Sequence, residues 1–255
     1  HGLLSWQDQQ TAAVRFDCSI HDIELQALRL GILPQRYQRN RHCLSTTDQL
    51  ILCSSKVAII GCGGLGGYLV ELLARLGIGS LQVIDPDCFD EQNLNRQLLA
   101  DLDNLGKPKV LAARDRISRI NPAVELIPIQ ETLTADNAGQ LLQDCRIAVD
   151  ALDNGTARQT LATACSARQI PLVHGAIAGW YGQVAVQLPE AKILPFLHTD
   201  DEPGIEQELG NPSFTPAVIA GLQAALVCRL LLGQAAQVPQ RTICIDLFHL
   251  ELSEL

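Results

Sequence analysis

The alternation of apolar and polar positions divides the chain into two parts. Apolar residues recur at helical spacing over residues 1 to about 34, most clearly from Ile20 to Leu30, before a glycine and a proline end the pattern. From Lys56 onward, short apolar runs of strand length alternate with longer stretches of helical period. The pattern predicts a small N-terminal helical extension over residues 1–35, followed by one larger domain over residues 36–255.

The apolar runs of the larger domain predict its strands, and the amphipathic stretches predict its helices. We expect strands at Val57–Ile60, Leu81–Asp85, Val124–Gln130, Ile147–Leu152, Leu172–Ile177, Gln183–Leu188 and Thr242–Leu247. We expect helices at Leu65–Leu76, Lys109–Ile120, Asn137–Gln143, Thr156–Arg168 and Pro216–Leu232. Strands that alternate with helices form a mostly parallel sheet with helices on both faces. The predicted fold class is therefore α/β, with a Rossmann-like, mostly parallel sheet and added antiparallel strands.

A glycine-rich turn, Gly61-Cys62-Gly63-Gly64-Leu65-Gly66, joins the first of these strands to the first helix. Glycines allow the backbone to approach phosphates closely, and the helix directs its positive N-terminus at them. Asp85, 24 residues after Gly61 and at the end of the next strand, suits a ribose hydroxyl. The turn therefore predicts a nucleotide site. By itself it leaves NAD, FAD and ATP open, and its structural alternative is a tight strand-to-helix turn.

Polar segments farther along the chain narrow the choice of nucleotide. They are Asp85-Pro86-Asp87, Asn93-Leu94-Asn95-Arg96-Gln97, Gly106-Lys107-Pro108-Lys109, Arg119-Ile120-Asn121-Pro122 and Asp150-Ala151-Leu152-Asp153-Asn154. Fixed cations and a carboxylate near phosphates suit a triphosphate with magnesium, whereas hydride transfer does not need them. In the order and spacing of these segments, the chain from about Arg36 to Leu255 resembles the ThiF/MoeB/HesA family, the bacterial relatives of ubiquitin-activating enzymes.

The resemblance implies an ATP-binding adenylation domain over residues 36–255. Its reaction would be adenylation of the C-terminal glycine carboxylate of a ubiquitin-like sulfur-carrier protein, ThiS- or MoaD-like, with ATP and Mg²⁺ and with release of pyrophosphate. The pathway would be that of thiamine, molybdopterin or tungstopterin. Two alternatives stay open: adenylation of another acceptor, such as a small-molecule carboxylate or a modified tRNA base, and a non-catalytic scaffold that docks a carrier.

The resemblance also assigns site residues. The catalytic set is Arg39, Arg96, Lys109 and Asp153, with Asp153 as the Mg²⁺ ligand. The ATP-binding set is Gly61, Gly63, Gly64, Gly66, Asp85, Asp87, Asn93, Gln97 and Asn154. Arg39 matches a family arginine that reaches into the partner subunit's site, which implies a homodimer.

Each of these charged residues also has a structural interpretation. Arg96 could form a surface salt bridge, Lys109 could be an exposed lysine in the first turn of its helix, and Asp153 could cap the helix that follows. We expect two other polar residues to be structural: Asp150 as an acid at a strand end and His174 as a core histidine with its hydrogen bonds satisfied. For Arg96, Lys109 and Asp153, the occurrence of all three together in the family's order favours a functional role.

Composition changes the picture in two respects. The net charge of -9 and the pI of about 5.1 argue against a nucleic-acid surface. No run reaches the roughly 18 consecutive apolar residues of a membrane span, and the first residues lack the plan of a signal peptide. We therefore expect a cytoplasmic protein that binds neither nucleic acid nor membrane.

Cysteine usage bears on metal and on sulfur transfer. The chain has nine cysteines and no Cys-x-x-Cys pair, so we expect reduced thiols and no structural zinc. In the resembled family, residues 188–213 correspond to a crossover loop, and this segment contains no cysteine. We therefore expect no thiol that carries the activated protein onward, and we expect a separate sulfurtransferase to supply the sulfur.

Overall fold

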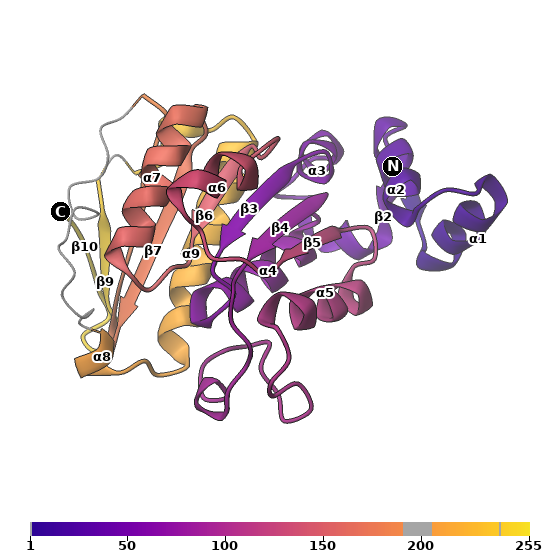
Figure 1. The fold of residues 1–255 in the computed structure, drawn as a ribbon. Helices are drawn as coiled ribbons and strands as arrows, with labels where there is room; N and C mark the ends of the chain where they lie inside the picture. The colour runs from indigo at the N-terminus through magenta and orange to yellow at the C-terminus, as the bar shows by residue number, and fades with distance from the viewer. Residues whose placement is uncertain (1, 191–205, 240) are drawn as a thin grey trace.

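The computed structural model describes residues 2–190, 206–239 and 241–255, and its main feature is one mixed sheet of eight strands (Figure 1). The strand order is β10-β9-β8-β7-β6-β3-β4-β5. The parallel strands are β3 (Lys56–Ile60), β4 (Ser80–Ile84), β5 (Glu125–Ile129), β6 (Ile147–Asp150) and β7 (Leu172–Ala178). Antiparallel pairing adds β8 (Tyr181–Gln187), β9 (Ile243–Asp246) and β10 (Glu251–Glu254) at one side. The predicted fold class is confirmed.

Helices cover both faces of this sheet. One face carries α4 (Gly64–Leu76), α5 (Lys109–Ile120) and α9 (Phe214–Leu231), and the other carries α6 (Ala135–Leu141) and α7 (Gly155–Arg168). Strand β3 shows the reason, because Val57 and Ile59 belong to the core under α4 while Ala58 and Ile60 belong to the core under α7. A strand that is buried on both faces has an uninterrupted apolar sequence, and this is the run that predicted it.

The N-terminal extension is helical, as the periodicity predicts. It contains α1 (Trp6–Phe16) and α2 (Ile20–Arg29), and Ser5 and Ser19 cap their N-termini by accepting from backbone N–H groups. The ring of His21 on α2 lies 3.0 Å from the carbonyl oxygen of Ala123, just before β5 begins. The extension therefore packs at the end of the sheet where the parallel strands begin, opposite the glycine turn.

Several short elements were not predicted. They are β1 (Leu3–Leu4), β2 (Leu33–Pro34), η1 (Gln35–Asn40), α3 (Thr46–Cys53), η2 (Glu91–Asn93), α8 (Glu206–Leu209), η4 (Ala235–Gln237) and β10. Strand β10 is exposed at all four positions, so it has no alternation of apolar and polar residues from which to predict it. Two strands end earlier than predicted, β4 at Ile84 and β6 at Asp150. Asp85 therefore lies in the loop after β4, and Asp153 lies in the loop after β6.

Helix α9 has the length and apolar character of a membrane span, with a mean hydropathy of 1.7, and it is the one such helix in the described part of the chain. It packs against α4 and against β7 and β8. Ile219, Leu226 and Val227 are buried in these contacts. Its apolar composition is therefore that of a core helix.

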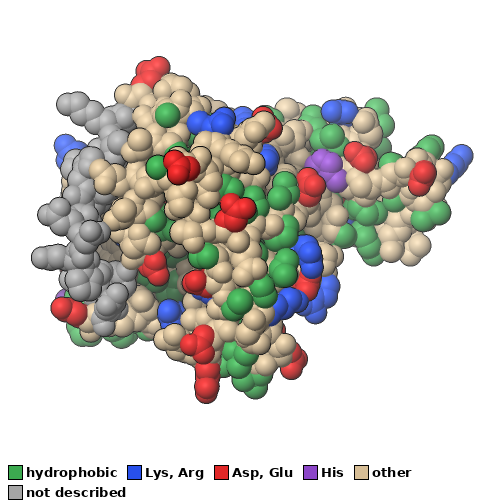
Figure 2. All heavy atoms as spheres, in the orientation of Figure 1, with side chains coloured by type: hydrophobic (Ala, Val, Ile, Leu, Met, Phe, Trp, Pro, Cys, Tyr) green, Lys and Arg blue, Asp and Glu red, His purple; other side chains and the backbone are tan. Residues whose placement is uncertain are grey.

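On the molecular face drawn in Figure 2, acidic and basic side chains are interspersed over the surface. Lys and Arg side chains do not gather there into one broad basic patch among the residues that the structure describes. The described residues on this face therefore do not present the clustered cations that neutralise several phosphates of a nucleic acid.

Candidate functional site

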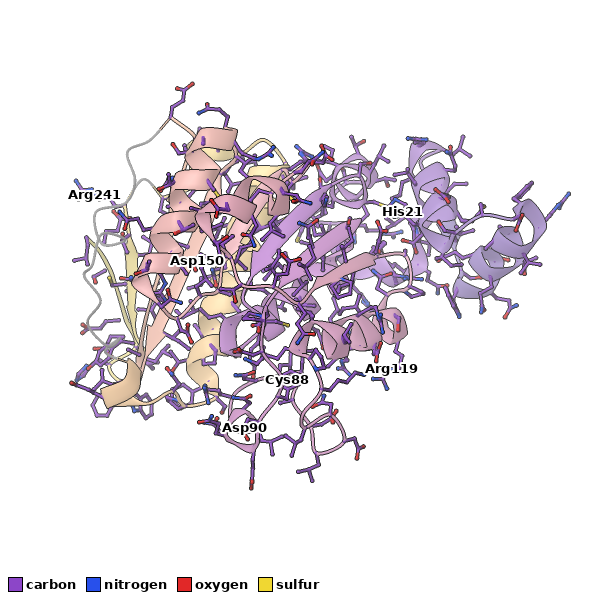
Figure 3. All side chains as sticks on the ribbon, viewed as in Figure 1. His21, Cys88, Asp90, Arg119, Asp150 and Arg241 are labelled. Carbon is purple, nitrogen blue, oxygen red and sulfur yellow. The ribbon has the colours of Figure 1, made fainter. Side chains whose placement is uncertain are left out.

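A cavity of about 800 Å³ lies where the parallel strands β3, β4 and β6 end. In open α/β sheets, ligands bind in the crevice outside the carboxyl ends of the strands. The cavity brings together most of the site residues predicted from sequence: Gly61, Gly63, Gly64, Asp85, Asp87, Arg96, Gln97, Lys109, Asp153 and Asn154. Figure 3 labels Asp150 at the end of β6, and Cys88 and Asp90 on the loop that follows β4.

The glycine turn forms one wall of the cavity, and its tight geometry requires glycine at two positions. Gly61 has φ of +99°, and a Cβ there would lie 2.4 Å from the carbonyl oxygen of Ala151. A Cβ at Gly66 would lie 2.0 Å from the carbonyl oxygen of Gly61. Gly66 therefore acts through packing of the helix onto the turn and does not line the cavity itself. No side chain caps the N-terminus of α4, so its first N–H groups stay available to an anion.

Asp85 fixes the position of this turn. Its Oδ2 accepts a hydrogen bond of 2.6 Å from the backbone N–H of Cys62, and its Oδ1 accepts one of 2.8 Å from that of Asp87. Burial raises the pKa of the Asp85 carboxyl, and the Lys109 ammonium and these two N–H groups oppose that shift. The carboxylate thus joins β4 to the turn after β3, while Cys62 fills the core beside it.

Lys109 is buried at the start of α5, so the interpretation as an exposed first-turn lysine is wrong. Its Nζ lies 2.9 Å from Oδ2 of Asp87 and 3.9 Å from Oδ1 of Asp85. Two carboxylates therefore hold one ammonium against the cavity wall. A phosphate that enters the cavity meets this ammonium and competes with Asp87 for it.

Arg96 brings a second cation to the cavity. Its Nη1 donates bonds of 2.9 Å to the carbonyl oxygen of Gln92 and to Oδ1 of Asn95. It forms no ion pair with any carboxylate that the structure describes, so the surface salt bridge considered from sequence is not observed there. The stem of Arg96 runs past Gly64, at the N-terminus of α4. The helix N-terminus and the guanidinium therefore reinforce each other's attraction for anions.

Asp153 lies in the loop between β6 and α7. The helix cap is its neighbour Asn154, whose Oδ1 accepts a bond of 2.8 Å from the N–H of Ala157. Asp153 is therefore not the cap, and its exposed carboxylate has no hydrogen bond or ion pair within the described ranges. No group of three or more His, Cys, Asp or Glu side chains there could hold a metal. A single free carboxylate fits Mg²⁺, which is bound through one or two carboxylates together with substrate phosphates.

Arg158 is a cavity residue that the sequence reasoning missed. Its Nη2 donates a bond of 2.5 Å to the carbonyl oxygen of Leu152, and its Nε lies 3.7 Å from Oδ2 of Asp150. Asp150 in turn accepts from the N–H of Leu152 at 2.9 Å. Asp150 and Arg158 thus hold the loop that carries Asp153 from two sides. The available signal was spacing, since Arg158 follows the N-cap Asn154 by one helical turn.

The buried His174 has the satisfied, structural character expected of it. Its Nδ1 lies 2.6 Å from Oδ2 of Asp150, and its Nε2 lies 3.3 Å from the side-chain nitrogen of Gln183. Gln223 donates a further bond of 2.8 Å to the carbonyl oxygen of Asp150. These contacts make Asp150 a structural residue that fixes the end of β6 next to the cavity.

Besides Gly66, two predicted site residues do not line the cavity. Asn93 is buried in η2, where its Oδ1 accepts a bond of 2.9 Å from the N–H of Asp90. That bond is a capping interaction, so the proposed contact of Asn93 with phosphate or ribose stays a prediction. Arg39 lies on η1 at the opposite end of the sheet, and its neighbour Tyr37 packs there against Gly77 at the end of α4. Arg39 therefore cannot reach the cavity of its own chain.

Comparison with known proteins places these features in one family. The sequence model of the ThiF family matches residues 37–255. The SAMP-activating enzyme E1 of Haloferax volcanii is 32% identical over 199 residues, which are 76% of this chain and 74% of that protein. The molybdopterin-synthase adenylyltransferase of Escherichia coli is 30% identical over 220 residues, which are 81% of this chain and 85% of that protein.

Solved structures show the same fold at lower identity. Escherichia coli MccB, solved with MccA-N7isoASN, superposes with a TM-score of 0.76 at 20% identity and covers 87% of this chain and 71% of its own. Escherichia coli tRNA N6-threonylcarbamoyladenosine dehydratase, TcdA, solved with ATP, superposes with a TM-score of 0.69 at 24% identity and covers 80% of this chain and 96% of its own. Because the ThiF family model matches the chain from residue 37 to its last residue, 255, this chain belongs to the ThiF family.

Proposed function

We propose that this chain is an adenylyltransferase that uses ATP to activate the C-terminal glycine carboxylate of a ubiquitin-like sulfur-carrier protein ending in Gly-Gly. The observation that carries the proposal is the meeting of Arg96, Lys109 and the uncapped α4 N-terminus in one cavity. Related enzymes support the acceptor: the sulfur carrier protein ThiS adenylyltransferase of Bacillus subtilis is 32% identical over 227 residues, which are 83% of this chain and 64% of that protein. The carrier is ThiS- or MoaD-like, and the pathway is that of thiamine, molybdopterin or tungstopterin.

The chemical difficulty of this reaction is negative charge. A carboxylate oxygen of the carrier forms a bond to the α-phosphorus of ATP, and the bond from that phosphorus to the bridging oxygen breaks, so that pyrophosphate leaves with the electron pair. The protein therefore needs cations at the phosphates and does not need a nucleophile of its own. Arg96 forks onto phosphate oxygens, and Lys109 places a point charge on the α-phosphate or on the leaving pyrophosphate.

The glycine turn and Asp85 position the nucleotide. The N–H groups at the start of α4 donate to phosphate oxygens, and Gln97, Asn93 and Asn154 supply further hydrogen-bonding groups. Asp85 holds the turn against β4, next to the place where the ribose of a Rossmann-type ligand lies. Asp87 releases Lys109 to the incoming phosphates, since its own side chain faces solvent.

Asp153 would hold Mg²⁺ together with the phosphates of ATP, and the metal ion would neutralise part of the charge on the leaving pyrophosphate. The clamp of Asp150 and Arg158 on the loop of Asp153 keeps that carboxylate at the cavity mouth. Its fixed position reduces the reorganisation that the site must undergo when the nucleotide arrives.

The active species in this proposal is a cytoplasmic homodimer in which Arg39 completes the site of the partner subunit. The enzyme stops at the acyl-adenylate, holds no zinc, and depends on a separate sulfurtransferase. The part of the crossover segment at residues 191–205 lies outside the described residues, and its lack of cysteine is a property of the sequence alone.

Exchange of labelled pyrophosphate into ATP tests the proposed function directly. Exchange is expected only with Mg²⁺ and a carrier that ends in Gly-Gly, because the carrier carboxylate is the attacking group. A carrier that lacks its last glycine is the matched control. Equal exchange with that shortened carrier, or with a small-molecule carboxylate, would overturn the choice of acceptor, and binding of NAD in place of ATP would overturn the whole proposal.

A further inference from the structure

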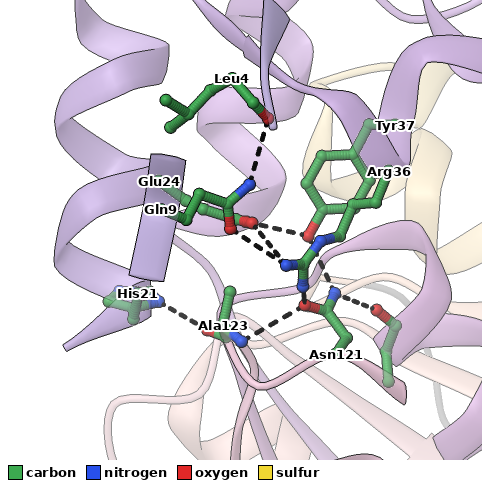
Figure 4. Close-up of polar contacts among 9 residues, drawn as sticks. Leu4, Gln9, His21, Glu24, Arg36, Tyr37, Asn121 and Ala123 are labelled. Atoms are coloured by element: carbon green, nitrogen blue, oxygen red, sulfur yellow. Dashed lines mark hydrogen bonds and ion pairs between the residues drawn. The ribbon is translucent and has the colours of Figure 1, made fainter. Parts of the chain in front are cut away.

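A cluster of polar side chains, buried except for the partly exposed Arg36, helps to join the N-terminal extension to the larger domain (Figure 4). We call it the anchor cluster, and it consists of Gln9, Glu24, Arg36, Tyr37 and Asn121. Gln9 comes from α1 and Glu24 from α2, whereas Asn121 follows α5. The family match begins at residue 37, so the helices that supply Gln9 and Glu24 lie outside it.

Arg36 is the centre of the anchor cluster. Its Nη2 donates a bond of 3.0 Å to Oε1 of Gln9 and lies 3.3 Å from Oε1 of Glu24. Its Nη1 donates to Oδ1 of Asn121, and its guanidinium carbon lies 5.4 Å from the centroid of the Trp6 ring. The two extension helices and the end of α5 therefore hold one guanidinium among them.

Glu24 is fully buried, which is costly for a carboxylate without partners. Its Oε2 accepts a bond of 3.2 Å from the hydroxyl of Tyr37, and that hydroxyl accepts one of 2.8 Å from Nδ2 of Asn121. Burial raises the pKa of the Glu24 carboxyl, and the charge of Arg36 and the Tyr37 bond oppose the shift. Apolar residues could attach a helix without the desolvation cost of buried polar groups. The polar contacts therefore fix the position of the extension helices as well as attach them.

The segment that receives these contacts is η1, which also carries Arg39. In a 3₁₀-helix, side chains at positions i and i+3 lie above one another. Arg39 therefore follows Arg36 by one turn on the same side of η1. Arg39 is exposed, and its guanidinium has no hydrogen bond or ion pair with the residues that the structure describes. The anchor cluster thus fixes the turn from which an unpaired guanidinium projects.

We propose that the extension is a positioning device for Arg39: through Gln9 and Glu24 it sets the turn of η1 so that Arg39 points into the site of a second copy of this chain. This inference rests on the proposed function, in which Arg39 acts across the subunit boundary. Gln9 and Glu24 are positioning residues, because they touch neither nucleotide nor carrier and act only through Arg36 and η1.

The variants Gln9→Ala and Glu24→Gln test the device, with Gln10→Ala as the matched control. Gln10 is the neighbour of Gln9 on α1, but it is exposed and takes no part in the hydrogen bonds and ion pair of the anchor cluster. We expect carrier-dependent exchange to fall at least about tenfold in the two test variants and to stay normal in the control, since a displacement of ~1 Å can cost about 10²-fold. Circular dichroism checks folding, and Gln9→Ala, which removes two hydrogen bonds but no charge, serves if Glu24→Gln unfolds. Normal activity in both test variants, with both proteins folded, would overturn the proposal.

A mixing experiment separates positioning from a general structural effect. A Glu24→Gln subunit mixed with an Asp153→Ala subunit should regain activity as an Arg39→Ala subunit does, since the cavity of the Glu24→Gln subunit is intact and its partner supplies a correctly placed Arg39. Failure of the Glu24→Gln subunit to regain activity, under conditions in which an Arg39→Ala subunit does so, would overturn the inference. Absence of exchange in the wild-type protein would instead overturn the proposed function, and the inference with it.

Discussion

Lys109 and Asp87 form an ion pair in which one partner is buried and the other is exposed. Their atoms Nζ and Oδ2 lie 2.9 Å apart, and the side chains are 8% and 64% exposed. Asp87 can therefore turn toward solvent, whereas Lys109 stays in the cavity wall and is held at 3.9 Å by the buried Asp85. A cation with one exchangeable and one permanent partner is suited to receive a phosphate without losing its position.

Replacement of Lys109 should affect both catalysis and stability. We expect Lys109→Gln to reduce adenylate formation by about 10²-fold, because a charge that faces the transition state is lost. It should also lower the free energy of unfolding by about 3 kcal/mol, because Asp85 remains as a buried carboxylate without its cation. Pyrophosphate exchange and urea denaturation measure the two effects.

Lys107→Gln is the control for this prediction. Lys107 pairs with Asp115 at the surface, where both side chains are more than a third exposed. Exposed pairs contribute little, so the free energy of unfolding should change by about 0.5 kcal/mol or less. If Lys109→Gln is no less stable than Lys107→Gln, then Asp85 does not depend on Lys109.

Asp153→Ala and Arg96→Ala should each reduce adenylate formation by at least about 10²-fold, or roughly 2.7 kcal/mol of transition-state stabilisation. Neither side chain forms an ion pair with a described residue, so the far-ultraviolet circular dichroism and the melting temperature should change little. A folded variant of either residue with near-normal pyrophosphate exchange would remove that residue from the catalytic set.

The dependence of stability on pH should reveal the buried Glu24. Burial raises its pKa in the folded state, so its contribution to stability is fully present below the unfolded pKa of about 4.3 and is lost as pH rises through the folded value. The stability of Glu24→Gln relative to wild type should therefore increase as pH rises through this window. Urea denaturation of both proteins at several pH values measures the difference.

Asp22, on the same helix, should show the opposite sign. A hydrogen bond from the Ser19 side chain, followed by one from the Ser19 backbone, lowers the pKa of its carboxyl. Its contribution is present above the unfolded pKa and is lost as pH falls through the folded value. Asp22→Asn should therefore lose stability relative to wild type as pH rises. Equal signs for the two variants would contradict the assigned environments.

No covalent intermediate with the carrier is expected. Burial raises the pKa of Cys53 and of Cys165 to about 12 and that of Cys145 to about 11, so these thiols are protonated at neutral pH. Mass spectrometry without reductant should find the carrier and this chain as separate masses, and metal analysis should find no stoichiometric zinc. A dithiothreitol-sensitive adduct, at the exposed Cys43 or Cys88 or at any other cysteine, would overturn this prediction.

The sequence predicted the sheet well because its strands are buried on both faces. The run Val57–Ile60 contains no polar residue, which is typical of a strand buried on both faces. Gly61 marks the end of the strand, because it has a positive φ that other residues rarely adopt. The ends of such strands also predicted the cavity, since parallel strands bring their following loops together. Strand β10 escaped prediction because it buries nothing and is defined only by its pairing with β9.

The anchor cluster escaped prediction for a different reason. Gln9 and Glu24 are polar residues within amphipathic helices, where such residues are normally placed in solvent. Their burial depends on Arg36 and Asn121, which lie 27 and 85 positions from Gln9 and Arg36 respectively. Contacts between residues so far apart in the chain leave no periodic pattern in the sequence. Arg158 was likewise hidden, because its role depends on the carbonyl oxygen of Leu152, which any residue would supply.

The last prediction concerns Arg39 and the dimer. Arg39 lies on η1 at the end of the sheet opposite the cavity, so it can serve an active site only in another chain, as an arginine finger supplied in trans does. An Arg39→Ala subunit and an Asp153→Ala subunit should each be inactive alone. Mixed dimers pair the intact Arg39 of one chain with the intact cavity of the other. Full exchange makes about half of the dimers mixed, each with one working site, so about a quarter of wild-type activity should return. No recovery despite demonstrated subunit exchange would contradict the cross-subunit role of Arg39.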